Sequence, residues 1–305
     1  MEEKVKNFIR NVSYFLSQIP RWGLIVPIIA AILFRYFMIE NPQMLPEQKA
    51  EKEVEFHAVP TEQDMKVIEI VSSLPRNSKV LILVNYGPES RYELETAMSA
   101  LIVSLAEKNI GIAFATMIPN GIESAFMAVE KSIENGSFGK ERFVYGHEYT
   151  HLGFIVGGSI ASYLIANNFG EIRERDIFDG KTDIRQPLMK GINEISDFSA
   201  VFEFSSQTFD GIPGLVSFAA TLHEKEIPKI AFCSSDMLPA YIPFQNSRYF
   251  DGLVGGFRSL SVFIHEIHPS VKIERQYNTL STILLYIIGL VVFANLVNLG
   301  KKDKR

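Results

Sequence analysis

Residues 147–151 read His-Glu-Tyr-Thr-His and match the H-E-x-x-H pattern of zinc metallopeptidases. That chemistry needs a helix, because histidines four residues apart reach one zinc ion only from the same helical face. Gly146 and Gly153 border the segment, and its aromatic and β-branched residues favour a strand instead. In a strand His147 and His151 would lie about 13 Å apart, at 3.3 Å per residue. We therefore expect no metal site, and a zinc site at His147, Glu148 and His151 is kept only as an alternative.

Cys233 is the single cysteine of the chain, so an intrachain disulfide and a cysteine-rich metal site are both excluded. It ends an apolar run and is followed by Ser234, Ser235 and Asp236. A nucleophilic cysteine at a sharp strand-to-helix turn would be flanked by glycines and served by a histidine, and neither feature is visible here. A buried, inert thiol is the prediction, and a Cys-dependent hydrolase is the alternative.

Short apolar runs alternate with amphipathic segments through the middle of the chain, and this alternation indicates a parallel sheet with helical crossovers. The run at 79–84, KVLILV, is typical of a strand that is buried on both faces. The pattern predicts a doubly wound α/β fold, either flavodoxin-like or amidotransferase-like. Expected strands are 79–84, 110–115, 149–156, 199–204, 229–233 and 252–254, and expected helices are 61–74, 91–108, 122–133, 159–166, 213–224 and a last one through about residue 265.

Ligands of such folds bind at the carboxyl ends of the strands, which here carry small polar residues and glycines. The Gly157-Gly158 turn could also present amide N–H groups to an anion at a helix N-terminus. Helix caps and turns require the same residue types, so a purely structural role is the competing interpretation. The candidate ligand rim consists of Asn85, Tyr86, Gly157, Gly158, Ser206, Ser235 and Asp236. We identify no catalytic residue and no cofactor.

Two apolar runs flank this region, and each is long enough to cross a bilayer core of about 30 Å. Residues 22–39 contain one charge, Arg35, and residues 280–299 contain none. A buried core helix and a cleaved signal peptide are the alternatives for the first run. The expected organisation is a tail (1–21), a first span (22–39), a stalk (40–60), the α/β domain (61–268), a linker (269–279), a second span (280–299) and a tail (300–305).

The charge distribution gives an orientation and excludes one class of partner. Eight Lys and Arg residues lie in the two tails (4, 6, 10, 21, 301, 302, 304 and 305), against six near the span ends on the domain side (35, 49, 52, 258, 272 and 275). By the positive-inside rule both termini are expected in the cytoplasm and the domain outside it. A net charge of −5 without a basic stripe argues against nucleic acid as a partner.

The chain resembles a family of uncharacterised prokaryotic two-span membrane proteins with a central α/β domain. The resemblance rests on residues 80–94 (VLILVNYGPESRYEL), 145–158 (YGHEYTHLGFIVGG), 186–205 and 251–260 (DGLVGGFRSL). That family usually lacks the paired histidines, which implies that His147 and His151 are incidental. It more often has an aspartate at the position of Asn85, which argues against acid–base chemistry there. The domain is also distantly similar to the accessory domain of gliding-motility-type ABC transporters, which has no evident catalytic apparatus.

These observations together predict a membrane-anchored, non-catalytic α/β module for protein interaction or ligand sensing within a membrane complex. Its expected partners are the lipid bilayer and other membrane proteins or further copies of itself. The alternative is a membrane-bound hydrolase that uses either the histidine motif or Cys233. A transporter is a weaker alternative, because two spans do not form a transport path unless further copies or partner proteins complete it.

Overall fold

The computed structural model describes residues 59–136, 139–172, 187–216 and 227–268, which lie within one compact unit, Ala58–Ile273. Its strands are β1 (Lys79–Asn85), β2 (Gly111–Thr116), β3 (Tyr149–Phe154), β4 (Ala200–Ser205), β5 (Lys229–Cys233) and β6 (Gly252–Gly255). Its main helices are α4 (Glu62–Ser73), α5 (Arg91–Glu107), α6 (Gly121–Asn135), α7 (Ser159–Asn167), α8 (Phe169–Ile172), α10 (Leu238–Asn246) and α11 (Gly256–Ile267).

The six strands form one sheet in the order β3-β2-β1-β4-β5-β6, and every neighbouring pair is parallel. The predicted α/β fold with a doubly wound parallel sheet is therefore confirmed. The strand order, however, differs from the flavodoxin-like order 2-1-3-4-5 and equals that of dinucleotide-binding sheets. The difference arises because the chain leaves β1 for β2 and β3 on one side, and returns after β3 to place β4 on the other side of β1.

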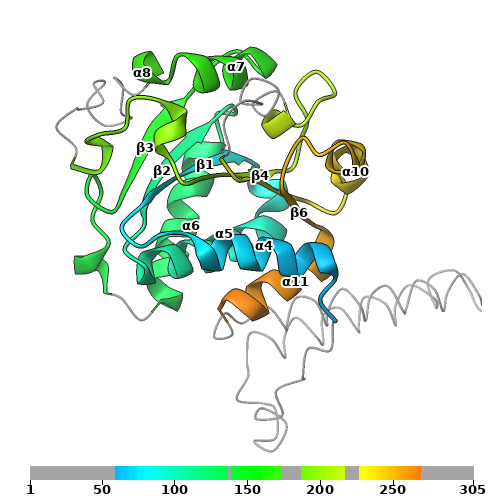
Figure 1. Ribbon diagram of the computed structural model, residues 1–305, viewed down its shortest axis with the longest axis horizontal. Coiled ribbons are helices and arrows are strands. Elements are labelled where there is room, and N and C mark those ends of the chain that lie inside the picture. The colour runs from blue at the N-terminus through cyan, green and yellow to red at the C-terminus, as the bar shows by residue number, and fades with distance from the viewer. Residues whose placement is uncertain (1–58, 137–138, 173–186, 217–226, 269–305) are drawn as a thin grey trace, which may run out of the picture. The chain divides into compact units, whose positions relative to one another are not determined.

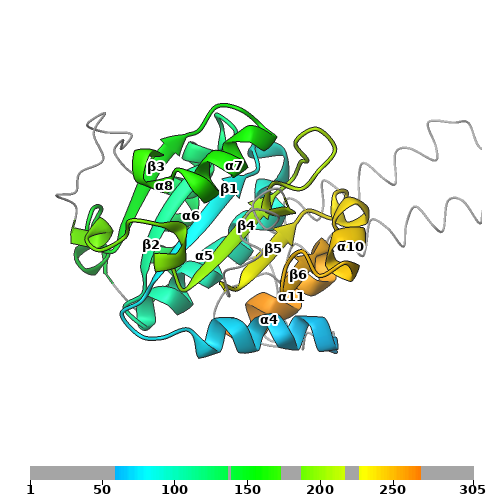
Figure 2. The same ribbon diagram turned by 45° about the horizontal axis from the view of Figure 1, so that its top comes forward.

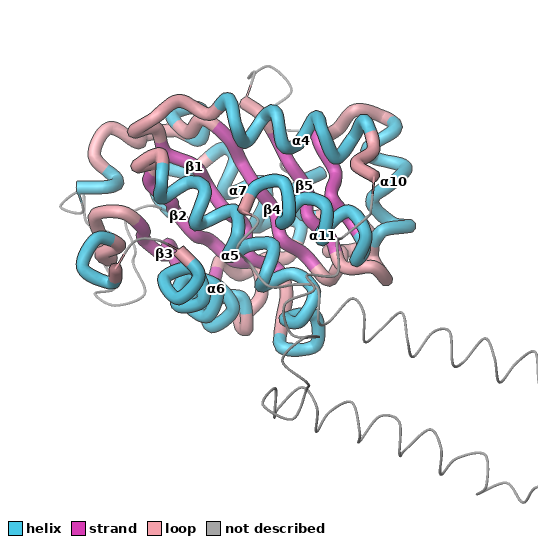
Figure 3. Tube along the Cα trace, turned by 90° about the horizontal axis from the view of Figure 1, so that it is seen from below, coloured by secondary structure: helices cyan, strands magenta, loops and turns pink. Residues whose placement is uncertain are grey.

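Helices cover both faces of the sheet, as right-handed crossovers require. Helices α4, α5, α6 and α11 pack on one face, where the side chains of Val80, Ile82 and Val84 meet them (Figures 1 and 3). Helices α7, α8 and α10 lie on the opposite face, over Leu81 and Leu83 (Figure 2). Alternate residues of one apolar run thus enter two separate cores, which explains why β1 shows no polar face.

The two edges of the sheet differ. Strand β6 lies beside α4, and Gly252 allows this close approach because a Cβ there would sit 2.4 Å from Val67 Cγ2. Helix α4 begins with a capping box, in which Thr61 and Asp64 each bond the other's backbone N–H. Asp64 also accepts an ion-pair contact from Arg258 of α11 at 3.3 Å. Strand β3 forms the other edge.

Sequence reasoning missed α10, whose Pro239 and Pro243 hide its helical pattern. Of the expected helix at 213–224, the structure describes residues 213–216, of which 214–216 are helical. The two apolar runs at 22–39 and 280–299, the tails, most of the stalk and the linker lie outside the described residues. Within the part of the chain that is described, no helix is long and apolar enough to cross a membrane.

Candidate functional site

The carboxyl ends of β1 and β4 are neighbours at the point where the strand order reverses, which is where doubly wound sheets bind their ligands. The register pairs Asn85, the last residue of β1, with Ser205, the last residue of β4. The loops that follow these two strands carry Tyr86 and Ser206. The structure therefore brings Asn85 and Ser206 together, as the sequence led us to expect.

A buried carboxyl group that sequence reasoning missed organises this point. Glu203 in β4 is fully buried, and its Oε1 accepts a hydrogen bond from Asn85 Nδ2 at 3.0 Å. Its Oε2 accepts from the backbone N–H of Leu215 at 2.9 Å and from the Tyr241 hydroxyl at 3.2 Å. Burial raises the pKa of Glu203, although these three donors act in the opposite direction.

The Glu203 cluster joins five separate segments of the fold. Asn85 Oδ1 accepts from the N–H of Met117 at 2.9 Å, so the loop after β2 is also tied in. A Cβ at Gly214 would lie 2.5 Å from Glu203 Oε1, which shows how closely the start of the helix at 214–216 approaches the carboxyl group. Every oxygen of this carboxyl has a donor within the domain. The cluster therefore holds together the ends of β1, β2 and β4, the helical residues 214–216 and helix α10.

Further along the rim, acidic side chains bond the loops of neighbouring strands. Glu89 accepts from the N–H of Gly87 and from the Ser206 hydroxyl, at 3.2 and 3.3 Å. Glu93, which is 5% exposed, accepts from both the N–H and the hydroxyl of Ser235. Burial raises the pKa of Glu93, while the bonds from Ser235 act to lower it. These contacts link the loop after β1 to the loop after β4, and the first turn of α5 to the loop after β5.

Other rim residues are placed differently from the expectation. Tyr86 is fully buried in the core beneath α5 and α6, and its hydroxyl has no hydrogen-bond partner among the residues that are described. Its side chain therefore does not belong to the rim. The Ser234 hydroxyl donates a hydrogen bond to Asp236 Oδ1 at 2.5 Å, so Asp236 stabilises the turn in which it lies.

The Gly157-Gly158 turn has the expected unusual backbone, with φ of 137° and 56°. The chain itself supplies an acidic group beside it: the Ser159 hydroxyl donates to Asp210 Oδ2 at 2.7 Å at the start of α7. An Asp210 carboxylate at a helix N-terminus is favoured by the helix dipole. The position that could have received an external anion is thus beside a carboxylate of the domain.

Cys233 is completely buried at the end of β5. Burial raises the pKa of its thiol, and the nearby Glu203, Glu93 and Asp236 raise it further. A Cβ at Gly255 of the adjacent strand would lie 2.6 Å from its Sγ, so the thiol is packed against backbone. A thiolate nucleophile needs a depressed pKa and access, and Cys233 has neither.

The histidine motif begins in a turn and continues into the expected strand, so only its second half is extended. His147 lies in the turn before β3, whereas His151 is 1% exposed in the middle of β3. The imidazole of His151 is stacked between Phe114 and Phe126, with ring centroids at 6.2 and 5.9 Å. Burial lowers its pKa to about 4. Among the described residues, no three His, Cys, Asp or Glu side chains are grouped so that they could hold a metal ion.

His151 instead completes the edge of the sheet. Its Nδ1 accepts from the N–H of Gly153 at 2.9 Å, and its own N–H donates to the Tyr145 hydroxyl at 3.3 Å. The carbonyl of Tyr149 accepts from the N–H of Gly146 at 2.7 Å. These three bonds cap groups on the side of β3 that faces away from β2.

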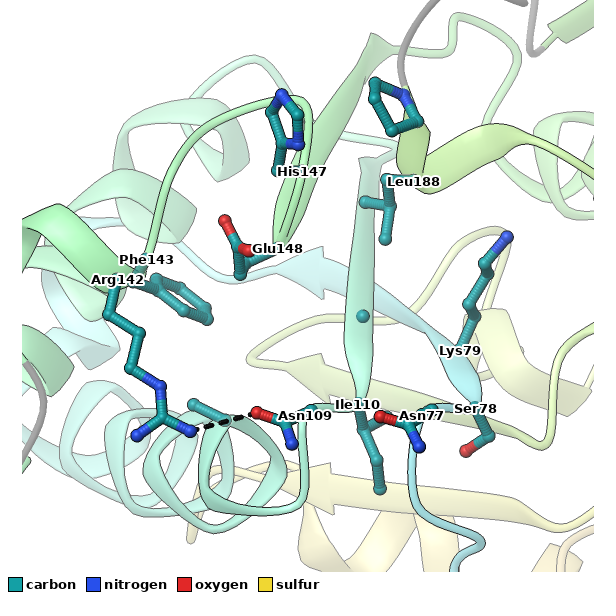
Figure 4. A pocket seen from close by; sticks show the side chains of 13 residues that line it. Asn77, Ser78, Lys79, Asn109, Ile110, Arg142, Phe143, His147, Glu148 and Leu188 are labelled. Carbon is teal, nitrogen blue, oxygen red and sulfur yellow. Dashed lines mark hydrogen bonds between the residues drawn. The ribbon is translucent and has the colours of Figure 1, made fainter.

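A cavity of about 250 Å³ lies at the opposite end of the sheet, where β1 and β2 begin. His147 and Glu148 line it together with Lys79, Arg142 and Asn109 (Figure 4). Sequence reasoning missed this cavity, because it is assembled from five turns and helix ends that are distant in sequence. Comparison with protein-family models, curated proteins and solved structures gives no match for this chain.

Proposed function

We propose that the protein is a membrane-anchored, non-catalytic α/β module that binds a protein partner or a small ligand within a membrane complex. The two apolar runs at 22–39 and 280–299 support the anchoring, since each has the length and composition of a span. The balance of Lys and Arg supports cytoplasmic termini and an extracytoplasmic domain.

One observation carries the interaction part of the proposal. The β3–α7 connection and the first two turns of α7 expose large apolar side chains: Val156 is 73%, Ile160 64% and Tyr163 56% exposed. Ile160 and Tyr163 are three residues apart on α7, so they share one face of that helix. Grouped apolar exposure of this kind is typical of a surface that another molecule covers.

The polar groups of the domain support a non-catalytic role. The acidic residues at the strand ends bond serines, amides and backbone N–H groups of the domain. A hydrolase would need Cys233 to be accessible, or both histidines of the motif to face one ion. The thiol is instead buried at the end of β5, and the second histidine is enclosed by aromatic rings within β3.

Photo-crosslinking in native membranes tests the proposal. A benzophenone amino acid at position 160 should give a discrete adduct, whereas the same group at position 66, an exposed residue of α4, should give none. A chain that remains uncrosslinked at both positions, and that purifies in mild detergent as a monomer without a partner or ligand, would refute the interaction function. Protease accessibility of the domain in intact cells and in opened cells tests the orientation separately.

A further inference from the structure

The cavity at the amino ends of β1 and β2 has features of a binding site. Its apolar wall comes from Phe143, Ile110 and Leu188, and Leu188 packs over Gly111, where a Cβ would lie 2.2 Å from Leu188 Cδ1. Its volume of about 250 Å³ corresponds to roughly eight water molecules at about 30 Å³ each. That volume suits a ligand smaller than a drug-sized molecule.

Several polar side chains around the cavity lack a partner within the described part of the chain. The Ser78 hydroxyl is buried without a hydrogen bond, and neither the Asn77 amide nor the His147 imidazole is bonded to another side chain. The Asn77 and Asn109 backbones have φ of 60° and 56°, which direct two chain reversals around the opening. Unused donors and acceptors beside an apolar wall are the usual lining of a small-molecule site.

The charges around the cavity favour an anion. Arg142 donates one hydrogen bond to Asn109 Oδ1 at 3.0 Å, and Lys79 donates one to the Lys190 carbonyl at 2.5 Å, so each retains further N–H donors (Figure 4). Arg76 and Lys108 precede Asn77 and Asn109 in the chain, which adds two positive charges next to these residues. Glu148 is the acidic residue of the lining, and its Oε2 is bonded by the N–H of Val144 at 2.9 Å.

The end of α5 does not oppose an anion strongly, although the carboxyl end of a helix is the negative end of its dipole. The carbonyls of Leu105 and Ala106 accept from the N–H groups of Ile110 and Asn109, at 2.9 and 3.0 Å. This pattern caps the last turn through the positive φ of Asn109. Both carbonyl oxygens therefore already accept hydrogen bonds from the domain's backbone, and this reduces the negative charge that the helix end presents to the cavity.

We propose that this cavity binds a small organic oxyanion, a carboxylate or a phosphate monoester. The oxyanion is held by the Arg142 guanidinium, and the organic part lies against Phe143, Ile110 and Leu188. Arginine suits this role because its planar fork pairs two donors with an oxyanion. This proposal specifies the class of ligand for the ligand-binding part of the proposed function, and it rests on that part of the proposed function only.

Calorimetric titration of the detergent-solubilised full chain tests the site, with benzoate and phenyl phosphate as probes and benzyl alcohol as the uncharged comparison. The charges are partly exposed, so the expected dissociation constant for the two anions is about 0.1–1 mM. Arg142→Gln should weaken binding at least about tenfold. Lys66→Gln removes one positive charge from α4, away from the cavity, and should bind as the unmodified chain does.

Three results would overturn the site: no saturable binding of either anion below about 10 mM, equal affinity for benzyl alcohol, or equal weakening by both substitutions. Binding only to bilayers that contain anionic lipid would also overturn it, since the proposed ligand is a small molecule. Thermal unfolding of the Arg142→Gln chain verifies that the substitution leaves the fold intact. Arg142-dependent binding with hydrolysis of phenyl phosphate would support the site while refuting the non-catalytic function. A failed titration leaves the crosslinking result at position 160 unaffected.

Discussion

The buried imidazole of His151 should make the domain's stability depend on pH. Its folded pKa is about 4, below the ordinary value of 6.5, because burial between aromatic rings disfavours the charged form. The folded state then binds fewer protons than the unfolded state between these two values. The contribution of His151 to the free energy of unfolding is therefore fully present above pH 6.5, and it is lost as the pH falls towards 4.

The size of the effect follows from the shift. A difference of 6.5 − 4 = 2.5 pKa units corresponds to about 3 kcal/mol at about 1.4 kcal/mol per unit. Glu203 and Glu93 have raised pKa values and so contribute the opposite slope at acidic pH. A variant is therefore needed to isolate the contribution of the histidine.

His151→Asn is suited to this purpose, because its amide oxygen can still accept from the N–H of Gly153 but does not titrate. Urea unfolding of the solubilised full chain, followed by near-ultraviolet circular dichroism of its tyrosines, would be measured from pH 7.5 to pH 4. The unmodified chain should lose about 3 kcal/mol more than the variant over this range. Parallel stability curves would refute the reasoning, as would a His151 proton resonance that titrates near pH 6.5.

Three further predictions follow from the packing. Glu203→Ala should lower the free energy of unfolding by about 2–4 kcal/mol in urea titrations, because it leaves Asn85, Leu215 and Tyr241 without their acceptor; a loss below about 0.5 kcal/mol would contradict this role. Cys233 should react with a thiol reagent at least about 100-fold more slowly in the folded chain than in urea, since it is buried and its pKa is raised; equal rates would show that the thiol is accessible. Gly121→Ala should destabilise the domain by about 1–3 kcal/mol in thermal unfolding, because its Cβ would fall 2.2 Å from the Val84 carbonyl oxygen. Gly139→Ala is the control and should change the stability little, since a Cβ at Gly139 would have no atom within 4 Å. Similar effects of the two substitutions would count against the packing described.

The strands were predictable because burial on both faces leaves an unbroken apolar run. The apolar runs of β1 and β5 could be recognised as strands without knowing which strands lie beside them in the sheet. The same reasoning correctly placed His151 in a strand, since the glycines and β-branched residues around it oppose a helix. The strand order was harder to predict, because it depends on which side of β1 the chain returns to after β3.

The site was predictable only in part. Small polar residues at strand ends led to Asn85 and Ser206, but the alternation of side chains along the backbone did not reveal that Tyr86 turns into the core. Glu203 could have been found from the sequence, because a lone carboxylate within the apolar run of β4 must have buried partners. The cavity at the other end gave no sequence signal, since Asn77, Asn109 and Arg142 lie in separate turns.

The capped edge of β3 limits how copies of this domain can meet. An exposed strand edge is a template onto which another chain can add a strand. Here Tyr145 and His151 occupy the N–H groups that an added strand would need, and α4 lies beside β6 at the opposite edge. Association of these domains should therefore be mediated by side chains, such as those of α7, which can be selective for one partner where backbone pairing cannot.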